Sequence, residues 1–211
     1  AYFDDSGQAF SGNTMRPYAK YEAVGETLDE GVLEKWYDRI AYFSVPRSIL
    51  LADGGETQIS QMTEEQKAEY GVKPSEVELA YLAAVKAYTG LPSRMDAART
   101  LVDQILRDEQ NANDYRKAQL IAQYLQNSYT YTLEPPVPPQ GVDFVTYFLD
   151  QGEGYCTYFA SAMTVMARLA GIPARYVEGF RMPANKESGV YRITGEYAHA
   201  WSEIYLLGVG W

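Results

Sequence analysis

Three consecutive stretches in the middle of the chain carry apolar residues at helical spacing. The first begins at a predicted cap, Ser75, and stops at Gly90; the second lies within residues 91–110 and the third within 113–129. Their one-sided apolar faces predict amphipathic helices that pack against another layer. The predicted faces of the second and third helices are Met95, Ala98, Val102, Ile105, Leu106, and Tyr115, Ala118, Ile121, Ala122, Leu125.

After residue 129 the pattern changes from helical spacing to short alternating segments. Residues 129–141 predict a short strand followed by an extended loop that contains four prolines, and residues 143–151 predict a short helix. The next apolar stripe begins at Cys156 and ends before Gly171 and Pro173, which predicts another helix. Helices followed by a sheet indicate an α+β fold. The predicted antiparallel strands are 174–180, 190–195 and 198–207.

The first 75 residues differ from the rest because polar, glycine and aromatic residues alternate without a sustained period. Two helical signals interrupt this part: an apolar stripe over residues 28–43, and Thr63 followed by an acidic turn, which resembles a capping box. The sequence therefore predicts an N-terminal extension over 1–75, mixed or irregular with a helix near 28–43, and a core over 76–211.

Composition narrows the possible partners. The chain has a formal net charge of −10 and an acidic pI of about 4.6, so nucleic acid and anionic membrane surfaces would repel it. No apolar run approaches the ~20 residues that span a bilayer, and the first residues lack the features of a signal peptide. The chain is therefore expected to be cytosolic or an excised soluble part of a larger protein. Nineteen tyrosines and three tryptophans suit a polymer-binding groove, but equally half-buried helices and strands.

The chain contains one cysteine, Cys156, and one histidine, His199. A single cysteine excludes an intrachain disulfide, and the pair is too few for an ordinary zinc site, so neither metal nor cofactor is expected. Cys156 falls at the first turn of a predicted helix, after a glycine-rich stretch. Unpaired N–H groups and the helix dipole there favour thiolate over thiol, and the same N–H groups could hold an oxyanion. His199, on a predicted strand, is the one available imidazole base.

Position alone leaves a second interpretation open. A lone cysteine is commonly a small buried apolar residue, and a lone histidine is commonly an ordinary surface or core residue. On the residues alone, a nucleophilic site and a buried thiol with an unrelated imidazole are both compatible with the sequence.

A family resemblance favours the nucleophilic site. The segments "GYCTYFASAMTVMARLAGIPARYVEGF" and "AHAWSEIYLLGVGW", preceded by "YTYTLEPPVPP", resemble the bacterial transglutaminase-like superfamily over roughly residues 78–211. The resemblance implies a papain-like α+β core in which the cysteine begins a helix packed on an antiparallel sheet. It implies Cys156 as nucleophile, His199 as base and acid, and acyl transfer at a protein or peptide amide through a thioester. Crosslinking, deamidation and proteolysis, including attack on cell-wall peptide, are all compatible with that chemistry.

The same resemblance implies an extracytoplasmic domain of a membrane-anchored parent protein. It also implies a third residue, an Asp shortly beyond the Gly-x-Gly-Trp that closes this sequence, so a truncated chain or a degenerate site is expected. Glu203 lies four residues from His199, ~13 Å along a strand, and is expected to be structural. Glu196 falls on the opposite face. A degenerate site would leave a non-catalytic module that binds peptide or glycan.

Aromatic residues near the two candidate catalytic residues are candidates for a substrate groove. One member of a flanking tyrosine pair is expected to be buried, because the two lie at helical spacing. Arg175, at the start of a predicted strand, is expected to form a structural salt bridge rather than to bind substrate. The groove candidates are Tyr155, Tyr158, Trp201 and Tyr197.

Overall fold

The computed structural model describes residues 62–69, 71, 76–92, 95–183 and 191–211, together with the backbone of four short strands before residue 60. These strands form two antiparallel pairs. The helix predicted near 28–43 and the cap predicted at Ser75 lie outside the described residues. The four strands are β1 (Tyr2–Phe3), β2 (Ala9–Phe10), β3 (Ser48–Leu50) and β4 (Glu56–Gln58).

The predicted helices between residues 63 and 129 are all present. The capping box is confirmed, because the Thr63 backbone N–H donates to Gln66 Oε1 and the Gln66 N–H donates to Thr63 Oγ1. The apolar faces of the later helices supply much of the core, including the completely buried Ala98 and Ile121. The helices are α2 (Glu64–Glu69), α3 (Glu76–Tyr88), α4 (Asp96–Ile105) and α5 (Asp114–Ser128).

The proline-bearing segment lies in sequence between two short strands that pair in parallel. β5 (Thr130–Tyr131) pairs with β6 (Glu153–Gly154), and α6 (Phe144–Gln151) lies between them in sequence. Asp143 caps α6 by accepting the Thr146 N–H at 2.8 Å. The short strand and the short helix predicted here are therefore both confirmed.

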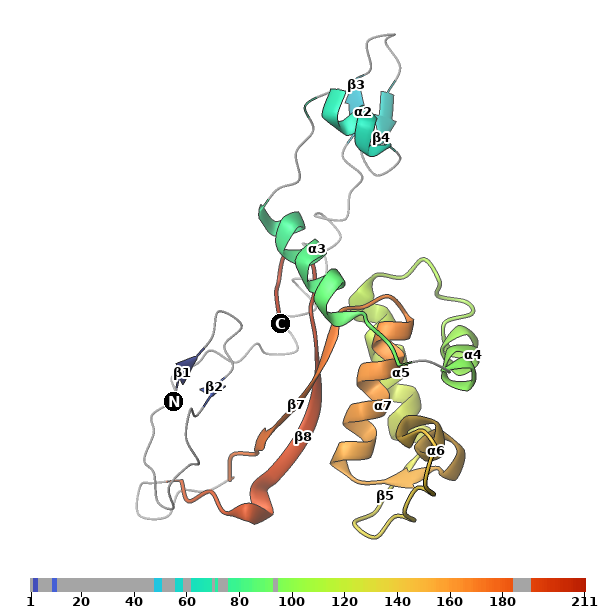
Figure 1. Cartoon of the computed structure of the whole chain (residues 1–211), viewed down its shortest axis with the longest axis vertical. Coiled ribbons are helices and arrows are strands. Elements are labelled where there is room, and N and C mark those ends of the chain that lie inside the picture. The colour runs from blue at the N-terminus through green and yellow to red at the C-terminus, as the bar shows by residue number, and fades with distance from the viewer. Residues whose placement is uncertain are drawn as a thin grey trace.

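The helix α7 (Cys156–Leu169) is central to the core. It ends where Gly171 adopts a left-handed φ of 83° and the Ile172 N–H bonds back to the Ala167 carbonyl, as the glycine predicted. Figure 1 shows the β7–β8 pair on one side of α7 and the helices α4, α5 and α6 on the other. The largest completely buried side chains are Phe148, Ile121, Met166, Ile172 and Pro173.

In the part of the chain that the structure describes, the sheet against α7 has two strands rather than the predicted three. β7 (Ala174–Phe180) and β8 (Ala198–Ile204) are antiparallel, and β8 ends three residues earlier than predicted. The strand predicted over 190–195 is wrong for its described part: residues 191–194 form no strand, and a 3-10 turn, η2 (Gly195–Tyr197), follows. Three of those four residues are exposed, so their alternation has no buried face to stabilise a strand.

Within the described ranges, no helix combines the length and the apolar character that crossing a membrane requires.

Candidate active site

Cys156 is the first residue of α7, as predicted from its neighbours. Tyr155 is the N-cap residue and has an extended backbone, but its side chain makes no capping hydrogen bond. The cysteine is free and partly exposed rather than buried in hydrocarbon. Cys156 therefore lies at the positive end of a helix dipole and remains accessible from solvent.

The glycine two residues before the cysteine is required by close packing. A Cβ atom at Gly154 would lie 2.6 Å from both Cβ and Cγ of Tyr158, one turn into α7. The Gly154 carbonyl also accepts the Thr132 N–H at 2.8 Å, across the β5–β6 pair. The absence of a side chain at Gly154 thus lets the β5–β6 pair lie directly against the first turn of α7, so that the position of Cys156 is fixed by both.

His199 is the second residue of β8 and is half-buried. It lies directly opposite Gly179 of β7 in the antiparallel register. A Cβ atom at Gly179 would lie 2.9 Å from the ring of Trp201, so the indole covers this glycine. The backbone direction of His199 is therefore set by a strand pair whose neighbouring positions are closely packed.

Cys156 and His199 line the same pocket, which has a volume of about 930 Å³. It lies between the first turn of α7, the segment after β5, and the ends of β7 and β8. No group of three or more acidic, cysteine or histidine side chains that could hold a metal ion occurs in the part of the chain that the structure describes. The lining residues are Tyr131, Leu133, Tyr155, Cys156, Thr157, Glu178, Gly179, Phe180, Arg181, Glu196, Ala198, His199 and Ala200.

The structure places one of the four predicted groove residues, Tyr155, on this pocket. Tyr158 is buried, with its ring centroid 4.4 Å from that of Phe144 and 5.0 Å from that of Tyr155, so the prediction that it lines the groove is wrong. Helical spacing turns Tyr158 towards α6, and the expectation that one of this tyrosine pair is buried is confirmed. Trp201 and Tyr197 also lie outside the pocket lining.

A polar cluster beside the cysteine was not predicted. The Tyr176 hydroxyl donates to Glu178 Oε1 at 2.6 Å, and the same hydroxyl interacts with the side chain of Thr157, the residue after Cys156. Burial first, and then the hydrogen bond to Glu178, raise the pKa of Tyr176, so the phenol stays protonated at neutral pH. The two residues are two apart in a correctly predicted strand, and this shared face was the signal available in the sequence.

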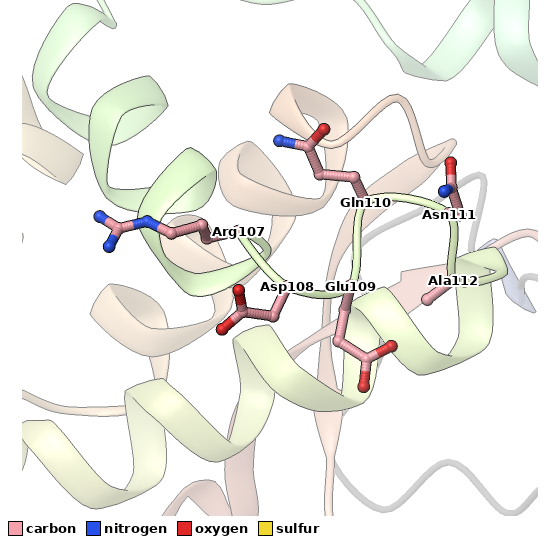
Figure 2. A pocket seen from close by; sticks show the side chains of 6 residues that line it. All are labelled: Arg107, Asp108, Glu109, Gln110, Asn111 and Ala112. Carbon is pink, nitrogen blue, oxygen red and sulfur yellow. The ribbon is translucent and has the colours of Figure 1, made fainter.

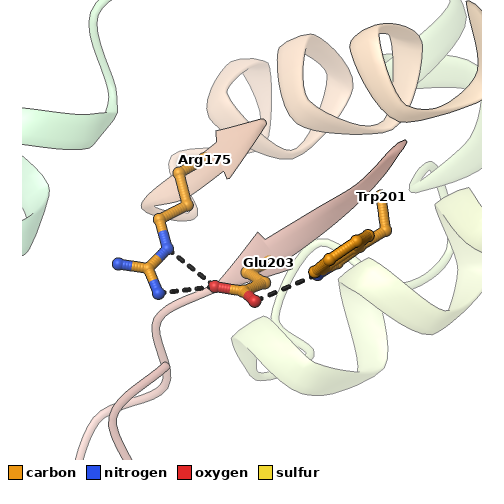
Figure 3. A network of polar contacts seen from close by, with 3 residues as sticks. All are labelled: Arg175, Trp201 and Glu203. Carbon is orange, nitrogen blue, oxygen red and sulfur yellow. Dashed lines mark hydrogen bonds and ion pairs between the residues drawn. The ribbon is translucent and has the colours of Figure 1, made fainter. Parts of the chain in front are cut away.

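The other face of the β7–β8 pair carries a structural ion pair. Arg175 is buried and its Nε and Nη2 lie 2.7 Å and 2.6 Å from Glu203 Oε2, while the Trp201 indole N–H donates to Glu203 Oε1 at 3.0 Å. Figure 3 shows this network. The Arg175 guanidinium also lies 4.0 Å from the centre of the Trp211 ring. The predictions that Arg175 and Glu203 are structural are therefore confirmed.

A second hollow lies away from this site, at the loop between α4 and α5. It has a volume of about 410 Å³ and is lined only by the consecutive residues 107–112 (Figure 2). Its side chains point outward from the loop, and none comes from the elements that hold Cys156 or His199. This second hollow is therefore separate from the pocket that Cys156 and His199 line.

Residues 99–211 match the family model of the Transglutaminase-like superfamily. Because this match covers more than half of the chain, the protein belongs to that superfamily. Among solved structures, the periplasmic domain of TgpA from Pseudomonas aeruginosa is similar, with a TM-score of 0.54 and 30% identity over 62% of this chain and 45% of that one. The family and this structural similarity confirm the predicted α+β, papain-like/transglutaminase-like core.

Two curated proteins are similar in sequence. Uncharacterized protein YebA of Bacillus subtilis is 38% identical over 133 residues, and a protein-glutamine gamma-glutamyltransferase of P. aeruginosa is 36% identical over 116 residues. The alignments cover 59% and 54% of this chain but only 18% and 17% of those proteins. The chain thus spans less than a fifth of the length of the curated relatives it matches.

Proposed function

We propose that this domain transfers acyl groups from protein or peptide amides, with Cys156 as nucleophile and His199 as base and acid. The observation that carries the proposal is that the sole thiol, at the start of α7, and the sole imidazole, on β8, line one pocket. Membership of the Transglutaminase-like superfamily, and a relative named as a protein-glutamine gamma-glutamyltransferase, support the same chemistry.

The proposed reaction has two balanced steps. In the first, His199 takes the thiol proton, sulfur bonds to the amide carbon, and the carbon–nitrogen bond breaks as the imidazolium returns its proton to the leaving amine. In the second, water or a primary amine attacks the thioester, gives its proton to His199, and releases the acid or a new amide with the thiol regenerated. The N–H groups of Cys156 and Thr157, the first two residues of α7, would stabilise the oxyanion of both steps.

We further propose that the domain works outside the cytoplasm, as part of a membrane-anchored parent protein. The similarity to a structure described as a periplasmic domain supports this location. Proteins and peptides of the cell surface, including cell-wall peptide, would then be the available substrates. The acceptor decides the outcome, since water gives deamidation or proteolysis and an amine gives a crosslink.

A non-catalytic binding module is the competing function, and one observation favours it. Glu203, the carboxylate on the same strand as His199, is engaged by Arg175 and Trp201 and is therefore not available to orient the imidazole. In such a module the pocket would hold a peptide or glycan without attacking it.

Alkylation of Cys156 separates the two functions. Because the chain has one cysteine, the mass gained with iodoacetamide reports this thiol alone. In urea the unfolded protein should be alkylated with the pH dependence of an ordinary thiol, whose pKa is about 8.5. If the thiol is activated by the fold, alkylation of the folded protein should begin at a lower pH. His199→Ala should move the folded profile towards the unfolded one and slow alkylation at pH 7 by about tenfold or more. Coincident folded and unfolded profiles, unchanged by His199→Ala, would refute the catalytic proposal.

A further inference from the structure

We infer that the pocket selects acyl donors that carry bulky apolar residues beside the reactive amide. This inference rests on the proposed function and assigns the donor specificity of the same site. Three large apolar side chains that line the pocket are held out towards solvent: Leu133 is 78% exposed, Tyr131 56% and Phe180 50%. Exposed apolar side chains are usually scattered singly over a protein surface. Several of them gathered at a concave site therefore indicate a binding surface.

The three side chains come from two segments that border the candidate catalytic pair. Tyr131 and Leu133 belong to β5 and the segment after it, which is hydrogen-bonded to the turn before Cys156. Phe180 is the last residue of β7, next to Gly179, the residue opposite His199. A substrate whose amide lies between sulfur and imidazole would therefore have apolar surface on the side of the cysteine and on the side of the histidine.

The part of this apolar surface formed by Tyr131 and the backbone of Leu133 is held in place before any substrate arrives. The Tyr131 ring stacks on Phe159 of α7, with ring centroids 6.0 Å apart and planes 28° apart. Thr132, between the two apolar residues, donates its N–H to Gly154 at 2.8 Å, and its hydroxyl accepts the Glu134 N–H at 3.2 Å. Prolines at 135 and 136 then stiffen the following backbone. Binding an apolar side chain here costs little ordering of the protein, which increases its contribution to affinity.

The charged groups of the pocket do not select a charged donor. Glu178 and Glu196 carry the opposite charge to Arg181, so both signs are present and the formal charges of these three side chains sum to only −1. Both carboxylates also accept internal hydrogen bonds, Glu178 from Tyr176 at 2.6 Å and Glu196 from Thr194 at 2.9 Å. The features left to discriminate between donors are therefore the apolar side chains.

The test compares two capped peptides, acetyl-Leu-Gln-Leu-amide and acetyl-Ser-Gln-Ser-amide, in the presence of cadaverine. Mass spectrometry follows ammonia loss, amine addition and peptide cleavage together. The leucine peptide should have a kcat/KM about tenfold higher or more, as expected from burial of one or two apolar side chains. Leu133→Ser should remove most of that preference, because it lowers kcat/KM for the leucine peptide more than for the serine peptide.

Val137→Ser is the matched control for Leu133→Ser. Val137 is 82% exposed in the same segment but does not line the pocket, so the two replacements remove similar exposed apolar surface. It should leave the ratio of the two peptides unchanged. Equal kcat/KM for both peptides, or an equal loss of preference in both variants, would overturn the inferred specificity while acyl transfer itself stands.

If neither peptide is turned over, the proposed function fails and protection from alkylation tests the pocket separately. Slower alkylation of Cys156 with the leucine peptide but not the serine peptide, lost in Leu133→Ser, would support an apolar binding pocket without catalysis. No protection by either peptide would overturn the inference as well.

Discussion

Replacing Gly154 by alanine tests how the start of α7 is held in place. The added Cβ atom would lie 2.6 Å from Cβ and Cγ of Tyr158. These atoms are next to the helix backbone, so rotation of the tyrosine side chain cannot remove the overlap with Cβ. Relief requires either the turn before Cys156 or the first turn of α7 to move.

The expected cost follows from the packing around Tyr158. The side chain is 5% exposed and its ring packs on those of Phe144, Phe148 and Tyr155, so no free volume receives it. Overpacking of this kind costs about 1–3 kcal/mol, from which a glycine-to-alanine entropy gain of about 0.4–1 kcal/mol is subtracted. We expect a net loss of about 1.3 kcal/mol in the free energy of unfolding, or about 3–5 °C in Tm for a chain of this size.

Urea and thermal unfolding measure this loss, with two other glycines as controls. At Gly90 no atom lies within 4 Å of an added Cβ and φ is not left-handed, so Gly90→Ala should keep the entropy gain and raise the free energy of unfolding by about 0.4–1 kcal/mol. At Gly152 there is equal space but φ is 81°, so Gly152→Ala isolates backbone strain of about 1 kcal/mol. Gly154→Ala should also slow alkylation of Cys156, because the helix start moves, whereas Gly90→Ala should not.

The reasoning is refuted if Gly154→Ala is as stable as Gly90→Ala and its cysteine reacts at the wild-type rate. That result would mean that the turn before the nucleophile accommodates a side chain without displacing α7.

Three further changes probe other features. Glu203→Ala leaves the buried Arg175 guanidinium without its carboxylate and should lower the free energy of unfolding by about 3 kcal/mol in urea; a change under about 1 kcal/mol would show that the ion pair is dispensable. Burial first, and then Tyr124, raises the pKa of Tyr129 to about 12, so the stability that the protonated phenol contributes is complete below pH 10 and is lost between pH 10 and about 12. In Tyr129→Phe the urea midpoint should therefore decline less steeply over that pH range. A decline with the same slope as in the wild type would contradict the assignment. Asp143→Ala removes the α6 cap and should cost about 1 kcal/mol by thermal unfolding, while Asp143→Asn should restore most of it.

The helix that carries the cysteine could be predicted because the residues that mark its two ends are its neighbours in sequence. Glycines precede Cys156, Gly171 supplies the left-handed residue after the last turn, and a continuous apolar stripe joins them. Such signals depend on neighbours in sequence, so they survive in any tertiary context that permits the fold.

The composition of the pocket could not be predicted in the same way. Tyr158 is three residues from Tyr155, and only the packing of α6 decides that one is buried and the other lines the pocket. Leu133 and Phe180 lie 47 positions apart and border one pocket only after β5 pairs with β6, the short strand before Cys156. The prediction of a third strand was wrong for residues 191–194, because an alternating pattern does not by itself provide a neighbouring strand or a buried face.

The contacts of α3 bear on where a working fragment could be cut. The Tyr81 hydroxyl donates to Asp114 of α5 at 2.6 Å, the ring of Tyr88 lies edge-on to Trp211 at 4.7 Å, and Arg168 of α7 donates to the carbonyl of Gly90 at 2.8 Å. Tyr81, Tyr88 and Gly90 all precede residue 99, where the family match begins. A fragment trimmed to the family boundary would expose the Trp211 ring and leave Asp114 and Arg168 without these partners, so the unit defined by sequence similarity is smaller than the unit defined by packing.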